Sequence, residues 1–557
     1  MGTYLNPGKA AFEEAVNTAI FVDKTEMVQY LNSVLKTKQK YVSVSRPRRF
    51  GKTMAADMIC AYYDREADSR ELFSGRKLAA CAPVRVGETE VQWDTYLGQF
   101  DVIRLVMTDF IRDDRLIDDT ISVISHRVLN ELEGLYPDIK YDSDDISFSL
   151  QKFYRHSGRQ FVIVIDEWDA VFRKWKSDEK GQQKYLDFLR DLLKDKPYIA
   201  LAYMTGILPI KKSGTHSSLN MFTEYSMTSP MQMGPYTGFL EEEVKGLCQE
   251  YGRDYDKIRE WYDGYAVNDA IPPDKNCINY IESGITPQAM RYSLYNPLSI
   301  VKAVRNGHIM NYWNETETYE ALAEYICRDY DGLKDAVALL MDGGRVQIDT
   351  STFQNDMTTF NGRDDVLSLL IHLGYLGYDD KTSEVFIPNR EILDAFRTST
   401  KSSEWTDTFR SFELSQEILR ATLNKDAGKV AELVEKAHNQ AGNRTYNDEA
   451  ALSYAIQLAY YAARKYYTTI LELDSGKGYV DIAYLPAPKY SDKPALVIEL
   501  KYNKTADTAM NQIRRQKYDD RLEHYKGNIL LVGIDYDKDV PNDKPEFKHH
   551  KCRIDEA

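Results

Sequence analysis

The residues nearest the N-terminus that could do chemistry lie in residues 43–57, SVSRPRRFGKTMAAD. Gly51, Lys52 and Thr53 follow an apolar run and open a helix-like segment, so backbone amides and a helix N-terminus would face one anion. In a loop of the form G-x-x-x-x-G-K-[ST], the lysine reaches the outer phosphates of ATP and the threonine hydroxyl binds Mg²⁺. Arg46 stands where that pattern requires its first glycine. A bare Gly-Lys-Thr run is also compatible with an ordinary helix start.

A second set of candidates lies further along the chain, in the segment FVIVIDEWDA. An apolar strand that ends in acid is the partner that a phosphate-binding loop needs: Asp166 would hold Mg²⁺, and Glu167 would orient or deprotonate the attacking water. Alone, this acidic pair is equally typical of a helix cap. The two motifs in this order favour ATP binding. Thr205, at the end of the next apolar run, would sense the γ-phosphate through its hydroxyl, although a threonine at this place is by itself more typical of a turn.

The basic loop RPRRF supplies further contacts to the same site. Arg46, Arg48 and Arg49 are expected beside the phosphates, and one or more of them would pair with phosphate oxygens. Pro47 would stiffen a loop that has lost its first glycine. We therefore predict that Arg49 and Phe50 join the Gly-Lys-Thr residues in binding the nucleotide.

Three charged residues near the C-terminus predict a second site. Asp481 lies eighteen residues before Glu499, and Lys501 lies two residues beyond it. On adjacent strands, Glu499 and Lys501 would share a face and Asp481 would approach them. Two acids bind Mg²⁺, and a neighbouring lysine positions or deprotonates water that attacks a phosphodiester. A solvated strand face is the alternative, but the apolar residues ALVI before Glu499 favour a buried strand end.

Elements of an α/β pattern must position these residues. Four apolar runs rich in β-branched residues alternate with helix-like segments, as in a parallel sheet that is buried on both faces. They cover residues 40–45, 100–107, 161–166 and 198–206. A helix is predicted to start near Asp23. We predict a nucleotide-binding α/β domain over residues 1–237.

The rest of the chain divides into two further predicted domains. Residues 238–400 show helical periodicity and predict an α-rich lid, ending in a small winged-helix-like unit in which EVFIPNREI supplies a strand. The polar residues 398–407 are the predicted linker. Residues 401–557 combine a helix pair, two or three strands and a basic helix around 508–526, which predicts a separate α/β domain.

Bulk composition limits the function classes. The chain has 557 residues and a net charge of −15, which argues against a protein that coats nucleic acid generally, because such binding depends on Lys and Arg. The six cysteines form no Cys-x-x-Cys pair, which disfavours zinc ribbons and disulfide frameworks. No secretion leader and no apolar run of about 20 residues is seen, so a cytoplasmic protein without a membrane partner is predicted. His549 and His550, in the charged tail, are expected to be solvated rather than metal-bound.

Several segments carry a family resemblance. FVDKTEMV, SRPRRFGKT, VIVIDEWDA, NMFTEYSMTSP, YTGFLEEEV, WYDGYAV, YNPLSIVKAV and IHLGYLGY resemble the bacterial AAA-ATPase-like family whose members also carry a C-terminal PD-(D/E)XK nuclease domain. The resemblance implies a P-loop NTPase fold in which an arginine in place of the first Walker A glycine is usual, with VIVIDE as Walker B. It also implies that residues 21–25 lie near the base, and that residues 261–265 and 295–300 belong to the lid.

The same resemblance bears on the C-terminal domain. D-(x)n-E-x-K is the core of a restriction-endonuclease-like fold, and the resemblance adds Glu449 as a third acid on the metal side. It also places Gln512 and Tyr518 on a supporting helix. That helix carries four basic residues that suit a phosphate backbone and three acidic ones that make a solvated face equally compatible. These are Arg514, Arg515, Lys517 and Arg521, and Asp519, Asp520 and Glu523.

The leading hypothesis from the sequence is an ATP- and Mg²⁺-dependent protein whose nucleotide state regulates a metal-dependent nuclease acting on DNA or RNA. The alternative is an ATP-dependent signalling or scaffold switch in which the nuclease fold is only a binding module. An ATPase motor is a weaker third reading, because it would need an arginine across a subunit interface that the sequence does not identify. A homo-oligomer is therefore one of the open alternatives.

Overall fold

The computed structural model describes most of the chain, in ranges separated by short gaps. These are residues 2–112, 115–210, 219–271, 288–313, 319–328, 330, 332–401, 403–440, 449–474, 479–515, 525, 527–540 and 549–557. The chain forms two compact units. Unit 1 comprises residues 1–325 and 347–396, and unit 2 comprises residues 326–346 and 397–557. The three domain boundaries given above stay a prediction. Within the described ranges no helix has both the length and the apolarity needed to cross a bilayer.

Unit 1 is built on a five-stranded parallel sheet with the strand order β4-β5-β6-β1-β7. The strands are β1 (Tyr41–Ser45), β4 (Asp101–Val106), β5 (Phe161–Asp166), β6 (Ile199–Gly206) and β7 (Thr223–Tyr225). Every residue of β1, β5 and β6 is buried, as expected for strands covered on both faces. The four strands predicted from apolar runs are confirmed.

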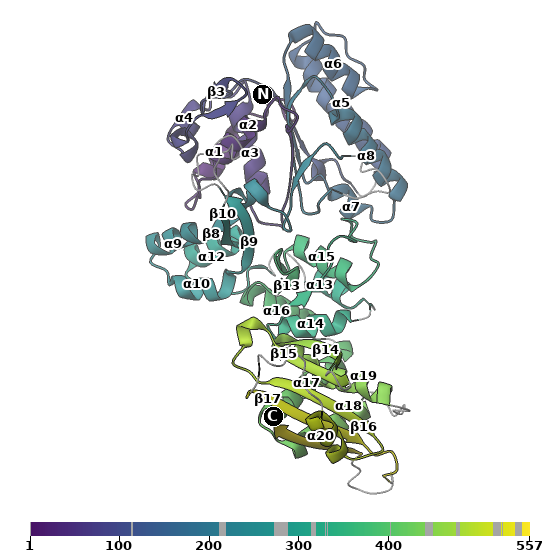
Figure 1. The fold of residues 1–557 in the computed structure, drawn as a ribbon. Helices are drawn as coiled ribbons and strands as arrows, with labels where there is room; N and C mark the ends of the chain where they lie inside the picture. The colour runs from purple at the N-terminus through teal and green to yellow at the C-terminus, as the bar shows by residue number, and fades with distance from the viewer. Residues whose placement is uncertain are drawn as a thin grey trace. The chain divides into compact units, whose positions relative to one another are not determined.

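Helices cover both faces of this sheet (Figure 1). One face carries α1 (Ala10–Val16), α2 (Met27–Val34) and α3 (Lys52–Tyr63), and the other carries α5 (Ile117–Leu135), α6 (Ile146–Ser157) and α8 (Glu179–Leu193). Because successive strand residues face opposite ways, Val162 and Val164 pack with α3 whereas Ile163 and Ile165 pack with α5 and α8. This packing fixes the ends of the strands, where the predicted site residues lie.

The middle of the chain is less purely helical than predicted. The helices α9 (Glu241–Glu250), α10 (Tyr255–Tyr262) and α12 (Pro297–Asn306) accompany a three-stranded antiparallel sheet. Its strands are β8 (Phe239–Leu240), β9 (Tyr265–Ile271) and β10 (Gln288–Tyr295), in the order β8-β10-β9. The sequences of β9 and β10 mix polar and apolar residues without clean alternation, so periodicity did not indicate them. Further on, α15 (Arg363–Leu373) leads into the hairpin of β12 (Gly377–Asp379) and β13 (Glu384–Phe386), which confirms the strand expected in EVFIPNREI.

Unit 2 contains a five-stranded mixed sheet with the order β14-β15-β16-β17-β18. The strands are β14 (Tyr467–Asp474), β15 (Tyr479–Pro486), β16 (Ala495–Tyr502), β17 (Ile529–Tyr536) and β18 (His550–Glu556), and only the β16–β17 pair is parallel. The apolar clusters place α17 (Ser403–Leu423), α18 (Ala427–Gln440) and α19 (Glu449–Ala459) on one face and α20 (Ala506–Arg515) on the other. The expectation of two or three strands was too low.

The predicted linker over residues 398–407 is wrong for most of its length. α16 (Arg390–Ser399) ends just inside it, and α17 begins at Ser403. Trp405 is fully buried, and its indole N–H donates to Cys327 Sγ at 3.3 Å. A polar composition indicated a loop, but one large aromatic side chain ties this segment into unit 2.

The helix predicted to start near Asp23 begins at Met27 instead. The Asp23 carboxylate accepts hydrogen bonds from the Thr25 amide at 2.9 Å and the Thr25 hydroxyl at 2.7 Å. Asp23 therefore stabilises the turn that precedes the helix, and it is not itself the residue at which the helix starts.

Candidate nucleotide-binding and nuclease sites

The loop between β1 and α3 takes its shape from two left-handed residues. Gly51 has φ 84° and precedes the first residue of α3, Lys52. Arg49 has φ 68°. Glycine adopts this region without steric cost, so Gly51 lets the chain turn sharply from the loop into the helix. The N-terminus of a buried twelve-residue helix then faces the same space as the Lys52 and Thr53 side chains.

Arg46 does not lie beside the phosphate end of this site, contrary to the expectation from the sequence. It is fully buried, and its guanidinium donates to the carbonyl oxygens of Ser45 at 2.8 Å and Tyr225 at 2.9 Å. Tyr225 belongs to the neighbouring strand β7, so the arginine braces the start of the loop against the sheet. Arg48 and Arg49 line the cavity instead.

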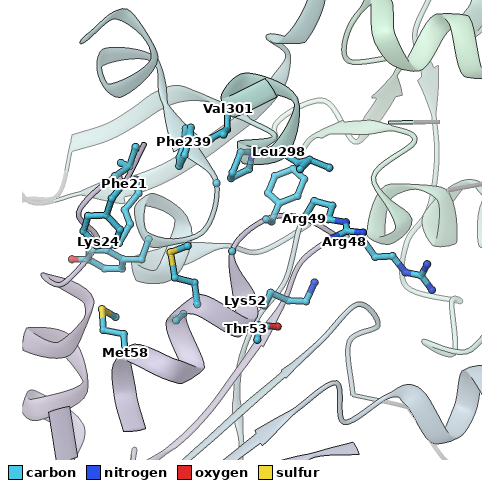
Figure 2. A pocket seen from close by; sticks show the side chains of 18 of the residues that line it. Phe21, Lys24, Arg48, Arg49, Lys52, Thr53, Met58, Phe239, Leu298 and Val301 are labelled. Carbon is cyan, nitrogen blue, oxygen red and sulfur yellow. The ribbon is translucent and has the colours of Figure 1, made fainter. Parts of the chain in front are cut away.

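A cavity of about 810 Å³ opens above this loop (Figure 2). Its volume falls in the range typical of small-molecule and cofactor sites. One side is polar and charged and includes Arg48, Arg49, Lys52 and Thr53 (Figure 2), and Gly51, Glu167 and Arg173 also line the cavity. The other side is mainly apolar, with Phe21, Met58, Phe239, Leu298 and Val301, and it also carries Lys24 beside Phe21 (Figure 2). A ligand with several anionic groups and one flat apolar ring system matches this division.

The apolar side is supplied partly by α12, in the segment YNPLSI. The Asn296 side chain accepts hydrogen bonds from the amides of Leu298 at 2.9 Å and Ser299 at 3.2 Å, and Pro297 occupies the first helical position. Both features favour a helix start at this point. The cap therefore fixes where Leu298 and Val301 enter the cavity wall (Figure 2).

Lys52 is a buried cation that is held by backbone oxygens. Its ammonium donates to the carbonyls of Arg46 at 2.9 Å and Pro47 at 2.7 Å. Burial lowers the pKa of Lys52 to about 8, although the carboxylates of Asp169, Asp166 and Glu167 oppose this shift. A phosphate that entered the cavity would give this ammonium a charged partner in place of neutral carbonyls.

Asp166 has the free coordination capacity that a metal ligand requires. Its Oδ1 accepts from the Thr205 hydroxyl at 2.5 Å and from the Glu167 amide at 3.0 Å. Its Oδ2 is buried and has no hydrogen-bond partner in the described structure. A buried carboxylate oxygen in that state fits a hard cation such as Mg²⁺. Thr205 is buried and orients Asp166, so its contact with the γ-phosphate stays a prediction.

Glu167 lies beside Asp166 in a backbone conformation with φ 52°. Its side chain lines the cavity and is 36% exposed, and its Oε2 accepts from the Arg173 guanidinium at 2.8 Å. Left-handed geometry at a residue other than glycine is uncommon and is often found where function constrains the backbone. The turn carries the Glu167 side chain into the cavity, whereas Asp166 stays buried.

The lowered pKa of Lys52 predicts a pH dependence of ATP binding. Bound polyphosphate favours the ammonium form and so raises the pKa of Lys52 above about 8, its value in the empty site, and binding takes up a proton between these two pKa values. We expect ATP affinity to fall by up to about tenfold per pH unit above that value. Titration calorimetry from pH 7 to 9.5 checks this, with Lys52→Arg as the control that does not titrate in the window. Parallel profiles in the two proteins would contradict the assignment.

In unit 2, the three predicted charges converge on adjacent strands. Ile482 of β15 lies opposite Ile498 of β16, so Asp481 and Glu499 face each other one residue further along. Asp481 Oδ2 accepts from the Leu500 amide at 2.7 Å. The Lys501 ammonium donates to Glu499 Oε1 at 2.9 Å and to the Leu500 carbonyl at 2.8 Å. The structure thus brings both acids and the lysine together at the ends of two strands.

Two of these three charged side chains are buried in unit 2. Glu499 is fully buried and Lys501 is 5% exposed. Ala495 and Val497 pack in the same apolar cluster as residues of α20, so alternation along β16 places Glu499 and Lys501 on that face. The alternative of a solvated strand face is therefore wrong. Among the residues that the structure describes, no three His, Cys, Asp or Glu side chains gather to hold a metal. A metal here would rest on Asp481, Glu499 and oxygens of the substrate.

The outer residues of the predicted nuclease site are only partly described. Glu449 is the first residue of α19, and its side chain lies outside the described part. Gln512 is a half-buried residue of α20, whereas Tyr518, Lys517 and Arg521 lie outside the described residues. Arg514 pairs with Asp555 at 2.5 Å, which reduces its value as a phosphate contact. The basic patch stays a prediction.

His549 and His550 are buried, so the expectation that they are solvated is wrong. His550 is the first residue of β18, which pairs with β17 as the edge strand, and His549 directly precedes it. Glu435 of α18 accepts from the amides of both residues at 2.9 Å, and its Oε2 lies 2.7 Å from His550 Nδ1. Their position near the chain end suggested solvent, but strand pairing and a buried carboxylate decide otherwise.

Two family models match the chain. Residues 8–216 match the AAA-ATPase-like model, described as "Predicted AAA-ATPase", and residues 449–544 match the PD-(D/E)XK nuclease superfamily. These matches contain Lys52, Asp166 and Glu167 in the first case and Asp481, Glu499 and Lys501 in the second. Together with the parallel sheet of unit 1 and the mixed sheet of unit 2, they confirm the predicted fold class.

Individual relatives are distant. A protein of Azotobacter chroococcum mcd 1, named "Uncharacterized protein in vnfD 5'region", is 23% identical over 315 residues, or 55% of this chain, and the match spans about half (52%) of that relative's length. The ORC2 protein of Aeropyrum pernix is 10% identical, with a TM-score of 0.25 over 68% of this chain and 91% of its own. Cdc6p of Pyrobaculum aerophilum is 10% identical, with a TM-score of 0.22 over 68% and 92%. At these scores neither structure supports an argument about this chain.

Proposed function

From a chain that carries an AAA-ATPase-like domain and a PD-(D/E)XK nuclease superfamily domain, we propose an ATP-binding and ATP-hydrolysing protein whose nucleotide state regulates a metal-dependent nuclease. The nuclease would act on phosphodiester bonds of DNA or RNA. The observation that carries the proposal is that each domain holds its own group of two acids and a lysine, with Lys52, Asp166, Glu499 and Lys501 buried and with Glu167 and Asp481 half-buried beside them. Both groups have the residue types that phosphate chemistry needs.

In unit 1, the cavity would bind ATP with its phosphates toward Lys52 and its base toward the apolar side. Thr53 and Asp166 would hold Mg²⁺, which supplies charge neutralisation on the phosphate oxygens when bound. Lys52 would bind phosphate oxygens, and Arg48 and Arg49 lie at the same end of the cavity. Glu167 would accept a proton from the attacking water.

In unit 2, Asp481 and Glu499 would hold the metal, which polarises the scissile phosphate when bound. The Lys501 ammonium lies on the same face of the sheet, where it would orient water or stabilise charge on the phosphate. Nucleic acid is therefore the proposed partner of unit 2.

The alternative, a nucleotide-dependent switch with a non-catalytic nuclease fold, is supported by one feature of the same site. The Lys501 ammonium already donates to Glu499 and to the Leu500 carbonyl. A buried ion pair of this kind can be retained for structure alone. Binding of nucleic acid without cleavage under any divalent metal would favour this reading.

Regulation by nucleotide is tested by cleavage of circular DNA, linear DNA and RNA with Mg²⁺ or Mn²⁺, with and without ATP. We expect ATP to change the cleavage rate of the wild type severalfold and to leave the rate of Lys52→Ala unchanged, because that variant has lost the phosphate-binding ammonium. Lys38→Ala, which replaces an exposed lysine before β1, is the matched control. An identical ATP response in Lys52→Ala would contradict regulation through this site.

A further inference from the structure

Arg173 lines the cavity of unit 1 and is not among the residues to which the proposed ATP hydrolysis gives a role. It belongs to α7 (Ala170–Lys174), the short helix that follows Asp166 and Glu167. It lines the same cavity as Lys52 and Thr53, and its side chain is 17% exposed. A guanidinium at the charged side of this cavity is within the region where the outer phosphates of ATP would lie.

The guanidinium of Arg173 is held between two carboxylates that differ in how firmly they are fixed. Its terminal nitrogen lies 2.8 Å from Glu167 Oε2, and its Nε lies 3.4 Å from Asp169 Oδ2. The Asp169 side chain is fully buried, and its Oδ2 accepts from the amides of Ile207 at 3.2 Å and Leu208 at 3.1 Å. Glu167 is 36% exposed. Asp169 thus anchors Arg173 to the end of β6, whereas the Glu167 contact lies at the solvent-accessible side.

This pairing opposes the role proposed for Glu167. A general base must point at the water whose proton it accepts, whereas the Glu167 oxygen that Arg173 holds points at the guanidinium. Arginine binds phosphate at least as readily as carboxylate, because its planar fork matches both. A γ-phosphate in the cavity would therefore compete with Glu167 for the same guanidinium.

We propose that Arg173 is a positioning residue that restrains Glu167 until a γ-phosphate is bound. In the empty or ADP-bound site, Arg173 holds the Glu167 carboxylate. When ATP binds, the terminal nitrogens of the Arg173 guanidinium turn to the γ-phosphate, while Asp169 continues to hold the Arg173 Nε. The Glu167 carboxylate is thereby released. Water then forms a bond to the γ-phosphorus, its proton passes to Glu167, and the bond to the β-phosphate oxygen breaks. This inference rests on the proposed ATPase function of the cavity.

The competition predicts a specific pattern of affinities. ATP and ADP dissociation constants are measured with Mg²⁺ on the full chain for the wild type, Arg173→Gln, Glu167→Gln and the double variant. Because a charged hydrogen bond to phosphate is lost, Arg173→Gln should weaken ATP binding by about tenfold or more and ADP binding by less than about twofold. Glu167→Gln should tighten ATP binding relative to ADP severalfold, because Arg173 no longer has a competing partner. In the Arg173→Gln background, Glu167→Gln should leave the ATP-to-ADP ratio unchanged.

The double variant distinguishes competition for the Arg173 guanidinium from the effect of removing the negative charge of Glu167. If Glu167→Gln raises the ATP-to-ADP ratio equally with and without Arg173, the effect is only removal of a negative charge and the proposal is overturned. Equal loss of ATP and ADP affinity in Arg173→Gln, with the thermal transition unchanged, would also overturn it and leave the proposed ATPase intact. Failure of the wild type to bind either nucleotide would overturn both. Lys174→Gln, which removes an exposed charge from the same helix, should bind like the wild type.

Discussion

Replacing Lys501 by alanine is expected to slow metal-dependent cleavage of nucleic acid by roughly 10²- to 10⁴-fold, the range for loss of a positioned acid–base group. The Lys501 ammonium is buried and lies 2.9 Å from Glu499 Oε1, so the substitution removes a cation that is held directly beside one of the two acids. The rate of phosphodiester cleavage with Mg²⁺ or Mn²⁺ measures the effect directly.

Two comparisons make the Lys501 result interpretable. Lys504→Ala removes an exposed lysine three residues on, and it should cleave at the wild-type rate because the hydrogen bond to Asp535 comes from the backbone amide, which alanine retains. Lys501→Ala leaves Glu499 buried beside the gap and could destabilise unit 2, so Asp481→Asn serves as an isosteric second variant. It should lose cleavage while the thermal transition is retained. Cleavage at the wild-type rate by both variants would show that the nuclease site lies elsewhere.

Asp166→Asn is expected to reduce Mg²⁺-dependent ATP hydrolysis by about a hundredfold or more, because a bound metal contributes several kcal/mol to phosphoryl transfer. The amide keeps the size of the side chain and an oxygen for the Thr205 hydroxyl. It removes the charge from the buried Oδ2 that has no hydrogen-bond partner in the described structure. Phosphate release with saturating ATP measures the effect.

ATP binding in the presence of EDTA distinguishes a metal ligand from a structural residue at this position. Asp166→Asn should bind ATP as tightly as the wild type without metal, and it should lose the gain in affinity that Mg²⁺ gives. Asp187→Asn is the matched control, since Asp187 is 46% exposed on α8. If Asp166→Asn retains full hydrolysis, the metal assignment fails.

The sequence by itself determined four buried strands of unit 1 and the residues whose chemistry depends on near neighbours. Continuous apolar runs indicated β1, β4, β5 and β6, because strands buried on both faces have no polar alternation. The order of the motifs Gly51-Lys52-Thr53 and Asp166-Glu167 was enough to predict that they form one site, because each follows a strand and parallel strands bring their carboxyl ends to one edge of the sheet. The spacing of Glu499 and Lys501 likewise fixed their common face.

Tertiary structure decided which distant residues supply the hydrogen-bond partners of the candidate site residues. Arg46 looks like a phosphate ligand in RPRRF, yet strand β7 offers it a carbonyl at Tyr225 and it becomes buried. Thr205 meets Asp166 because β5 and β6 are neighbours, and His550 meets Glu435 because β18 pairs with β17.

The physical reason is that sequence patterns depend on residues a few positions apart, whereas contacts in the folded chain join residues far apart in the sequence. Periodicity and residue type report which face of an element is apolar, and they act over one or two turns. Hydrogen-bond partners and burial of charge depend on which elements pack together, and packing is settled by the whole chain. The residues able to do chemistry were therefore readable from the sequence, whereas the partners that orient or restrain them were not.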